Sequence, residues 1–418
     1  MNGLFKSISV THPGSKTRHP PPNHRLIFSI NPVTILAVLF TGLHRQTDME
    51  LNRRNLIATL SSGAIIGTAG CNSLNPTDSN SENGDGEGSG DGENTQMPLE
   101  PIVYRTFDTH EMVMGGMKTV GPYKLSVSFT TPHWFWTVTG SRTNRVEHDG
   151  TGIHFMLTLW DEETGARVPT GDITTTLSQD GEEVASSVLW PMISQEMGFH
   201  FGDNIALPNN GDYTVDIEIS PATVNTLGAF EDGRFDENVS TTLEITTQDG
   251  YQGEPVPNAG VPGALEVMTM NGVPTGQLPT AENLPGQILG GGSKSDADFI
   301  VSESENLPAG VDGEGRYLAV SPRTPYNRIP LPLYALSAQY STESESDVEM
   351  ELSEAIHPDY GHHYGAVIDT TDPVTDVSVL SESPPQVSRH RGYEKAFIEG
   401  LTDTTIDITE DGVPSYDE

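Results

Sequence analysis

The sequence predicts an all-β protein with two antiparallel β-sandwich modules, preceded by a signal peptide and a disordered tether. Three observations lead to this prediction. Short runs of alternating apolar and polar residues recur between positions 101 and 407. Turn pairs such as Asp149-Gly150, Asp180-Gly181 and Asn210-Gly211 separate several runs, and such pairs favour hairpins. No amphipathic helix of useful length interrupts them. Alternation with frequent turns is typical of antiparallel sandwiches.

The first 48 residues differ in composition from the rest of the chain. Positions 1–47 contain no acidic residue, although the whole chain of 418 residues has 59. We therefore expect residues 1–48 to be an over-extended N-terminus, with Met49 as the true initiator. The alternative is a membrane segment around Leu26–Leu43, but Asn31-Pro32 interrupts this stretch and it is short for a span.

Residues 49–71 have the order of features found in a twin-arginine lipoprotein signal peptide. Arg53-Arg54 precedes the apolar stretch Leu56–Ile66, and small residues then lead to Cys71, the single cysteine. We expect cleavage before Cys71 and a lipid on its sulfur, which would hold an exported protein on the outer face of the cell membrane. The alternative is a buried helix that contains a cysteine by chance.

Residues 72–100 predict a disordered acidic tether. They are rich in Gly, Asp, Asn, Ser and Glu and offer little apolar surface to bury. The acidic residues alternatively suggest a calcium loop, but the EF-hand pattern with its terminal Glu is absent.

The charge of the chain predicts an acidic surface on a folded protein. Acidic residues outnumber Lys and Arg by 59 to 21, and the formal net charge is −38. The acids lie among apolar and aromatic residues instead of forming a separate block, which argues against a disordered acidic tail. Such a surface suits a halophile, where salt screens self-repulsion, and it disfavours nucleic acid as a partner.

Two β-rich stretches are separated by a Pro/Gly-rich connection. We expect a first module over residues 101–250, the connection over 251–297, and a second module over 298–418. The expected strands of the first module are Tyr123–Phe129, Gly152–Trp160, Asp172–Leu177, Glu183–Leu189 and Tyr213–Ile219. Those of the second are Phe299–Ser302, Arg316–Val320, Leu333–Tyr340, Val348–Leu352, Ala366–Asp369 and Val374–Leu380.

Two short motifs suggest that the modules are related. Phe199-His200-Phe201-Gly202 corresponds to His362-His363-Tyr364-Gly365, and Thr131-Pro132-His133 corresponds to Thr324-Pro325-Tyr326. The motifs follow the same order along the chain in the two modules, and each has a similar strand context. We therefore expect a distant internal repeat.

The strongest candidate ligands lie in the run from Trp190 to Asn204. Met192, Glu196, Met197 and His200 combine thioether, carboxylate and imidazole groups, of which imidazole suits copper, zinc or iron and thioether suits copper(I). The alternative is that the methionines fill the core and His200 caps a turn.

Further histidines extend this set in both modules. In the strand Ile153–Trp160, alternation places His154 and Met156 on the face opposite Ile153, Phe155, Leu157 and Leu159. His133 lies among aromatic residues and is a candidate helper. In the second module His363 and His390 are candidates for a second site, although adjacent histidines such as His362 and His363 are more often exposed.

The Met-rich hairpin that ends in His-aromatic-Gly, at Met192 and His200–Gly202, resembles the periplasmic iron-transport proteins of bacterial ferrous-iron uptake systems. The resemblance implies small immunoglobulin-like dimers that bind iron or copper through His, Met and Glu. It makes Met192 and His200 the ligands and His154 the strand histidine of the family. The chain departs from the pattern at Trp190 and Phe201. The family's Pro-Pro and Arg-His pairs are found only in the second module, at Pro384-Pro385 and Arg389-His390.

These observations predict an extracellular, lipid-anchored protein that binds a divalent metal, iron or copper, and supports its uptake. The expected partners are the membrane, through Cys71, and either a permease or a second copy of the chain. The alternative is a structural or adhesive surface module that binds protein or glycan. We do not expect an enzyme, because the sequence lacks the Gly-x-Ser-x-Gly, His-Glu-x-x-His and nucleotide-binding loop motifs.

Overall fold

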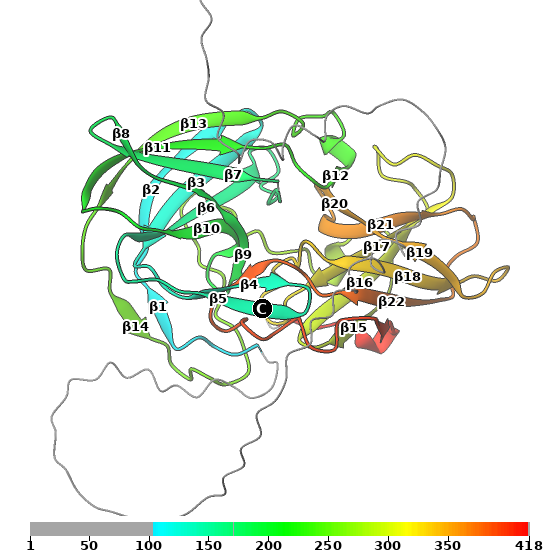
Figure 1. The fold of residues 1–418 in the computed structure, drawn as a ribbon. Helices are drawn as coiled ribbons and strands as arrows, with labels where there is room; N and C mark the ends of the chain where they lie inside the picture. Colours follow the sequence, from blue (N-terminus) through cyan, green and yellow to red (C-terminus); the bar gives the residue numbers. More distant parts are fainter. Residues whose placement is uncertain (1–102, 170, 417–418) are drawn as a thin grey trace, which may run out of the picture. The chain divides into compact units, whose positions relative to one another are not determined.

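The alternating runs of the first module fold as the predicted antiparallel strands. The computed structural model describes residues 103–169 and 171–416, so the predicted signal peptide, Cys71 and the tether lie outside the described residues. Every strand expected from the sequence overlaps an observed one. The fold is all-β, and each module is a sandwich of two sheets (Figure 1).

The first module pairs an eight-stranded sheet with a four-stranded sheet. The larger sheet has the order β2-β3-β6-β10-β9-β23-β4-β5 and the smaller β13-β11-β7-β8. The strands of the larger sheet are β2 (Val113–Val120), β3 (Tyr123–Thr130), β4 (Phe135–Thr139), β5 (Arg142–Val146), β6 (Ile153–Asp161), β9 (Trp190–Ser194), β10 (Gly198–Ile205) and β23 (Ser388–Arg389). Those of the smaller sheet are β7 (Ile173–Gln179), β8 (Glu182–Val188), β11 (Gly211–Ile219) and β13 (Val239–Thr247).

The second module pairs a six-stranded sheet, β12-β20-β21-β17-β16-β15, with a four-stranded sheet, β19-β18-β22-β24. The strands of the larger sheet are β12 (Asn225–Thr226), β15 (Gln287–Lys294), β16 (Ala297–Ser304), β17 (Arg316–Arg323), β20 (Ser353–His357) and β21 (Gly361–Ile368). Those of the smaller sheet are β18 (Ala335–Ser341), β19 (Val348–Glu351), β22 (Asp376–Ser383) and β24 (Thr404–Asp407).

The remaining elements are short. Strands β1 (Asp108–His110) and β14 (Gly253–Pro255) pair with each other, and the 3-10 helices are η3 (Gly228–Phe230), η4 (Ala281–Asn283) and η5 (Glu410–Gly412). Within residues 103–169 and 171–416, no helix has the length and apolar character that a membrane span requires.

The connection expected over residues 251–297 ends earlier than predicted, because Gln287–Lys294 form β15. Its run Gly290-Gly291-Gly292 belongs to the Pro/Gly-rich composition that predicted a connection. In the structure the absence of side chains lets another backbone approach: a Cβ on Gly291 would lie only 2.7 Å from the carbonyl oxygen of Gly412.

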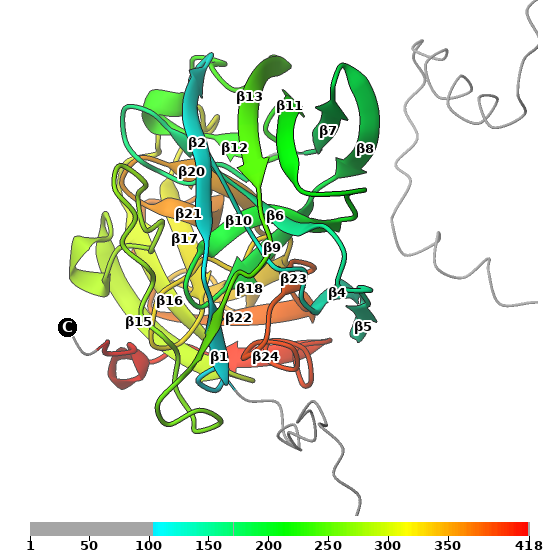
Figure 2. The same cartoon turned by 90° about the vertical axis from the view of Figure 1, so that its left-hand side faces the viewer.

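Each module donates a short strand to the other. β23 comes from the second module and pairs in parallel with β9 and antiparallel with β4 of the first (Figure 2). β12 comes from the first module and pairs in parallel with β20 of the second. The exchange ties the two sandwiches together and carries residues of the second module into the first.

The two motifs proposed as a repeat have different outcomes. The run Phe199–Gly202 lies in β10 and the run His362–Gly365 in β21, which occupy the same place in the two strand orders. The Thr-Pro correspondence is wrong. Thr131 follows β3, whereas Thr324 follows β17, the counterpart of β6. A match of two residues between strand ends is too short to specify which strand precedes it.

Candidate metal centre

Four histidines from separate parts of the chain meet on the outer face of the eight-stranded sheet. His154 lies on β6, His200 on β10, His133 between β3 and β4, and His390 directly after β23. One ring nitrogen from each of His133, His154 and His390 lies within 4.8 Å of the others. The rings of His200 and His390 are stacked, with centroids 5.2 Å apart.

Strand alternation explains why these rings face away from the sandwich core. Ile153, Phe155 and Leu157 of β6 join the apolar cluster between the sheets, so His154 projects to the opposite face. On β10, Phe199 and Phe201 point into the same cluster, and His200 projects with His154. The prediction for the β6 faces is therefore confirmed.

Met192 supplies a thioether to the same place. It lies opposite His200 in the β9–β10 ladder and is fully buried. Gly202 leaves room for it: a Cβ there would lie 3.1 Å from Met192 Sδ and 3.4 Å from His154 Nε2. The thioether sulfur and this imidazole nitrogen therefore flank the same glycine.

Hydrogen bonds to Nδ1 set the tautomers of His154 and His200. His154 Nδ1 donates to Asn204 Oδ1 at 3.0 Å, and His200 Nδ1 donates to the Gly198 carbonyl oxygen at 3.1 Å. Because both acceptors are oxygens of amide groups, the proton of each neutral ring lies on Nδ1 and leaves a lone pair on Nε2.

His133 and His390 are hydrogen bonded to each other, and this bond leaves the Nε2 lone pair of His390 free. His133 Nδ1 donates to the Thr131 carbonyl oxygen at 3.0 Å, so its Nε2 accepts from His390 Nδ1, also at 3.0 Å. The Nε2 atoms of His154, His200 and His390 are all buried and have no hydrogen-bond partner within residues 103–169 and 171–416. Buried polar atoms in proteins are normally paired, so the free lone pairs of His154 and His390, two members of the group within 4.8 Å, indicate a ligand site.

Burial keeps the four rings neutral. It lowers the pKa of His154 to about 3 and that of His200 to about 4. The pKa values of His133 and His390 also lie well below the ordinary histidine value, first because of burial and then because neighbouring rings repel a second positive charge. Neutral imidazole is the form that binds metals.

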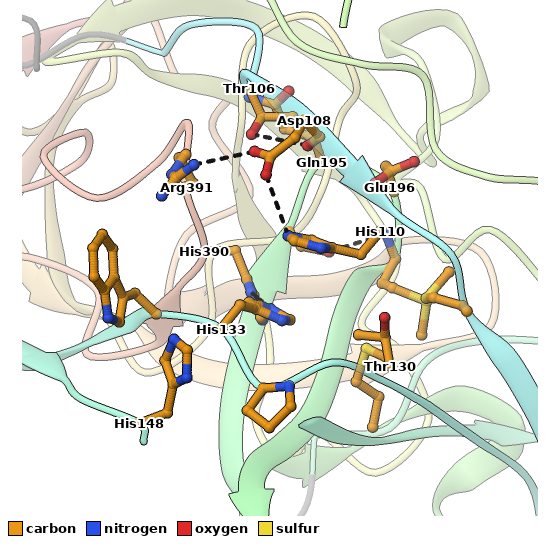
Figure 3. Close-up of a pocket in the computed structure, with 16 residues that line it drawn as sticks. Thr106, Asp108, His110, Thr130, His133, His148, Gln195, Glu196, His390 and Arg391 are labelled. Atoms are coloured by element: carbon orange, nitrogen blue, oxygen red, sulfur yellow. Dashed lines mark hydrogen bonds and ion pairs between the residues drawn. The ribbon is translucent and has the colours of Figure 1, made fainter. Parts of the chain in front are cut away.

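A cavity of about 230 Å³ reaches two of these histidines, His133 and His390 (Figure 3). His133, His390, Met156 and Met197 contribute to its lining, and Glu196 lines it near His110. Burial, reinforced by the charge of Asp108, raises the pKa of Glu196 to about 7. Glu196 and Met197 therefore line the same cavity as His133 and His390.

His110 and Asp108 form the outer wall of the cavity. The His110 ring stacks on His133, with centroids 4.8 Å apart, and Asp108 lies 3.1 Å from the Arg391 guanidinium (Figure 3). The sequence reasoning did not identify His110, because it lies on a three-residue strand with no ligand motif around it.

The structure separates His363 from His390. His390 lies in the centre just described, whereas the His363 ring stacks on Tyr360 and its Nε2 lies 3.0 Å from the Tyr317 hydroxyl in the sheet of the second module. The expected second site around these two residues is therefore not formed. Sequence reasoning could not place His390 in the first module, because strand exchange brings it there from 257 positions beyond His133.

Comparisons with known proteins agree with a division into two modules. Residues 159–242 match the family model of the Fe2+ transport protein, and residues 282–406 match that of a domain of unknown function, DUF7350. Met192 and His200 lie within the first match and His390 within the second. No curated protein matches the chain.

Two solved structures of FetP from uropathogenic Escherichia coli are similar to this chain at 18% identity. The match to a copper-bound variant covers 32% of this chain and 97% of FetP, with a TM-score of 0.26. The match to FetP as isolated covers 34% of this chain and 95% of FetP, with a TM-score of 0.24.

Proposed function

We propose that this protein binds copper or iron at a site completed by both modules and supports uptake of the metal. The observation that carries the proposal is the convergence of His133, His154 and His390, whose ligand nitrogens lie within 4.8 Å of one another. The Nε2 atoms of His154 and His390 are buried and unpartnered, the His200 ring stacks on His390, and the Met192 thioether flanks the same glycine as His154. Imidazole and thioether together suit copper(I) best, while iron(II) is also bound by imidazole. The family match over residues 159–242 supports transport of the metal as the purpose of binding.

The cavity supports capture from outside the protein. An incoming cation would pass Glu196 and His110 before it reaches the free Nε2 of His390. The formal charge of −38 would attract cations towards this opening, most strongly at low ionic strength. Because the ligands are already oriented by Nδ1 hydrogen bonds, binding needs little rearrangement of the protein.

The remaining features belong to the same proposal. The signal sequence ending at Cys71 supports export and lipid anchoring at the outer face of the membrane. A permease would then receive the metal, and no catalytic step is needed. The alternative adhesive role predicts histidines and methionines scattered over the surface, and the convergence of His154, Met192 and His200 argues against it.

Metal titration of near-isosteric variants tests the proposal. Purified protein is titrated with copper(I) in competition with a chelator, and with iron(II) under anaerobic conditions. We expect Met192→Leu and His200→Gln each to weaken binding at least tenfold, because each removes one donor while retaining the side-chain volume. Met114→Ala changes a methionine that is 44% exposed on β2 and should leave affinity unchanged. The proposed site would be disproved if the wild-type protein retained neither metal. It would also be disproved if the Met192→Leu and His200→Gln variants bound metal with the affinity of the wild type.

A further inference from the structure

The two modules contain equivalent positions, which the strand registers identify one by one. His200 and His363 each lie two residues after a glycine with φ near +65°, Gly198 and Gly361. In both cases the ring Nδ1 donates to the carbonyl oxygen of that glycine, at 3.1 Å. His363 is therefore the counterpart of His200 in the second module.

The exchanged strands provide the next pair. The backbone N–H of His390, just after β23, donates to the Ile193 carbonyl oxygen at 3.1 Å. The backbone N–H of Leu227, just after β12, donates to the Ile356 carbonyl oxygen at 3.0 Å. Both exchanged strands pair in parallel: β23 with β9, which precedes the His200 strand β10, and β12 with β20, which precedes the His363 strand β21. Leu227 therefore occupies in the second module the place that His390 takes in the first.

The ladders identify the counterparts of the other two ligands. Met192 lies opposite His200, and Ala355 lies opposite His363. His154 lies opposite Asn204, two residues beyond Gly202. Tyr317 lies opposite Val367, two residues beyond Gly365, and is thus the counterpart of His154.

In the second module, these replacements fill the place equivalent to the metal centre with a tyrosine and aliphatic side chains. Leu227, Tyr317, Ala355 and Tyr360 belong to one small buried apolar cluster. The Tyr317 hydroxyl lies against Gly365, where Met192 Sδ and His154 Nε2 lie against Gly202 in the first module. It also makes a 3.0 Å hydrogen bond with His363 Nε2. The nitrogen that is free in His200 is therefore occupied in His363.

We infer that the second module contains the remnant of a duplicated metal site, which lost three ligand positions and was closed by Tyr317. The chain accordingly binds one metal ion, and the second module contributes to that site by donating His390. The inference rests on the proposed function of the first module. It goes further by assigning the stoichiometry and by naming the three residues that abolish the second site.

Metal stoichiometry in paired variants tests the first part. The full chain is saturated with copper(I), desalted, and its metal content per chain is measured by mass spectrometry. We expect one ion in the wild type, none in His200→Gln, and one in His363→Gln. Two ions in the wild type, with one lost in His363→Gln, would overturn the inference and leave the proposed function standing. No ion in the wild type would overturn both.

Restoring the ligands tests the second part. The triple variant Leu227→His, Tyr317→His, Ala355→Met should bind a second copper(I) ion, and this ion should disappear when His363→Gln is added. Circular dichroism and a thermal melt establish that the variant is folded. A folded triple variant that still binds one ion contradicts the assignment of these positions. If the triple variant does not fold, Tyr317→His with Ala355→Met is used, and failure of this folded double variant to bind a second ion counts equally against the inference.

Discussion

Asn204 orients two of the four histidines through hydrogen bonds. Its Oδ1 accepts from His154 Nδ1 at 3.0 Å and from the His133 backbone N–H at 3.3 Å. Its Nδ2 donates to the His133 carbonyl oxygen at 2.9 Å. One amide group thus sets the tautomer of a ring on β6 and the position of the loop that carries His133.

Replacing Asn204 by alanine should therefore weaken metal binding without removing a ligand. We expect a loss of about 10- to 100-fold in copper(I) affinity, as is typical when a hydrogen-bond partner of a metal ligand is removed. Chelator competition measures the affinity, and Asn144→Ala on the exposed strand β5 is the control. Because all four histidines and Met192 remain, the stoichiometry should stay at one ion. Unchanged affinity in Asn204→Ala would mean that backbone packing alone orients His154.

Strand β23 shows how one short element links the two modules. Its Arg389 is fully buried, and the guanidinium donates to the carbonyl oxygens of Pro385, Ala396 and Phe397. Burial without a carboxylate partner lowers the pKa of Arg389 to about 9. The hydrogen bonds of Arg389 therefore stabilise the conformation of the segment that carries His390.

Loss of the Arg389 hydrogen bonds should affect both the stability of the protein and its metal binding. Arg389→Met should lower the free energy of unfolding by about 3 kcal/mol, because several buried carbonyl oxygens lose charged donors. It should also weaken copper(I) binding, because His390 is the next residue. Arg389→Lys should recover little of either, because an ammonium group cannot span three separated carbonyl oxygens. Urea unfolding and chelator competition measure the two effects. Arg142→Met, at an exposed position of β5, serves as the control. An Arg389→Met variant with lower stability but unaltered copper(I) affinity would show that the hydrogen bonds of Arg389 do not position His390 for metal binding.

The elements also show which parts of the site the sequence could predict. Alternation in Ile153–Trp160 was enough to place His154 on the face opposite the core, because strand geometry is local. The motif around His200 was likewise local and led to Met192. The sequence equally singled out His363, because its motif is nearly the same. Whether the ring nitrogen is free or bonded depends on Tyr317 of another strand, which no local pattern reveals.

At the scale of the whole molecule, the strand exchange explains what sequence reasoning could not find. The expected module boundaries followed composition, and they assigned His390 to a second site together with His363. In the structure β12 and β23 each cross to the other sandwich, so the metal centre needs both modules. The pairings of Asn225 with Ala355 and of Ser388 with Met192 leave no periodic signal, because each exchanged strand has only two residues.

Buried neutral histidines in both modules should make the metal-free protein sensitive to acid. Burial lowers the pKa of His154 to about 3, of His200 to about 4 and of His363 to about 3, against 6.5 for an ordinary histidine. Between these values and 6.5 the unfolded chain binds more protons than the folded one. Stability is therefore complete above pH 6.5 and falls as the pH drops towards 4, by about 2 kcal/mol per histidine at pH 5.

Variants separate this effect from protonation of the many carboxylates, which is shared by all forms. We expect His363→Gln and His200→Gln each to flatten the dependence of unfolding free energy on pH by about 1.4 kcal/mol per pH unit between pH 4.5 and 6. Urea unfolding of the metal-free proteins at constant salt measures the slopes. The two variants should act additively, because the residues lie in different sheets. Slopes equal to that of the wild type would mean that these rings are protonated in the folded protein. Protonated rings would contradict the free Nε2 lone pair of His200 and a neutral His363 ring that accepts the Tyr317 hydrogen bond.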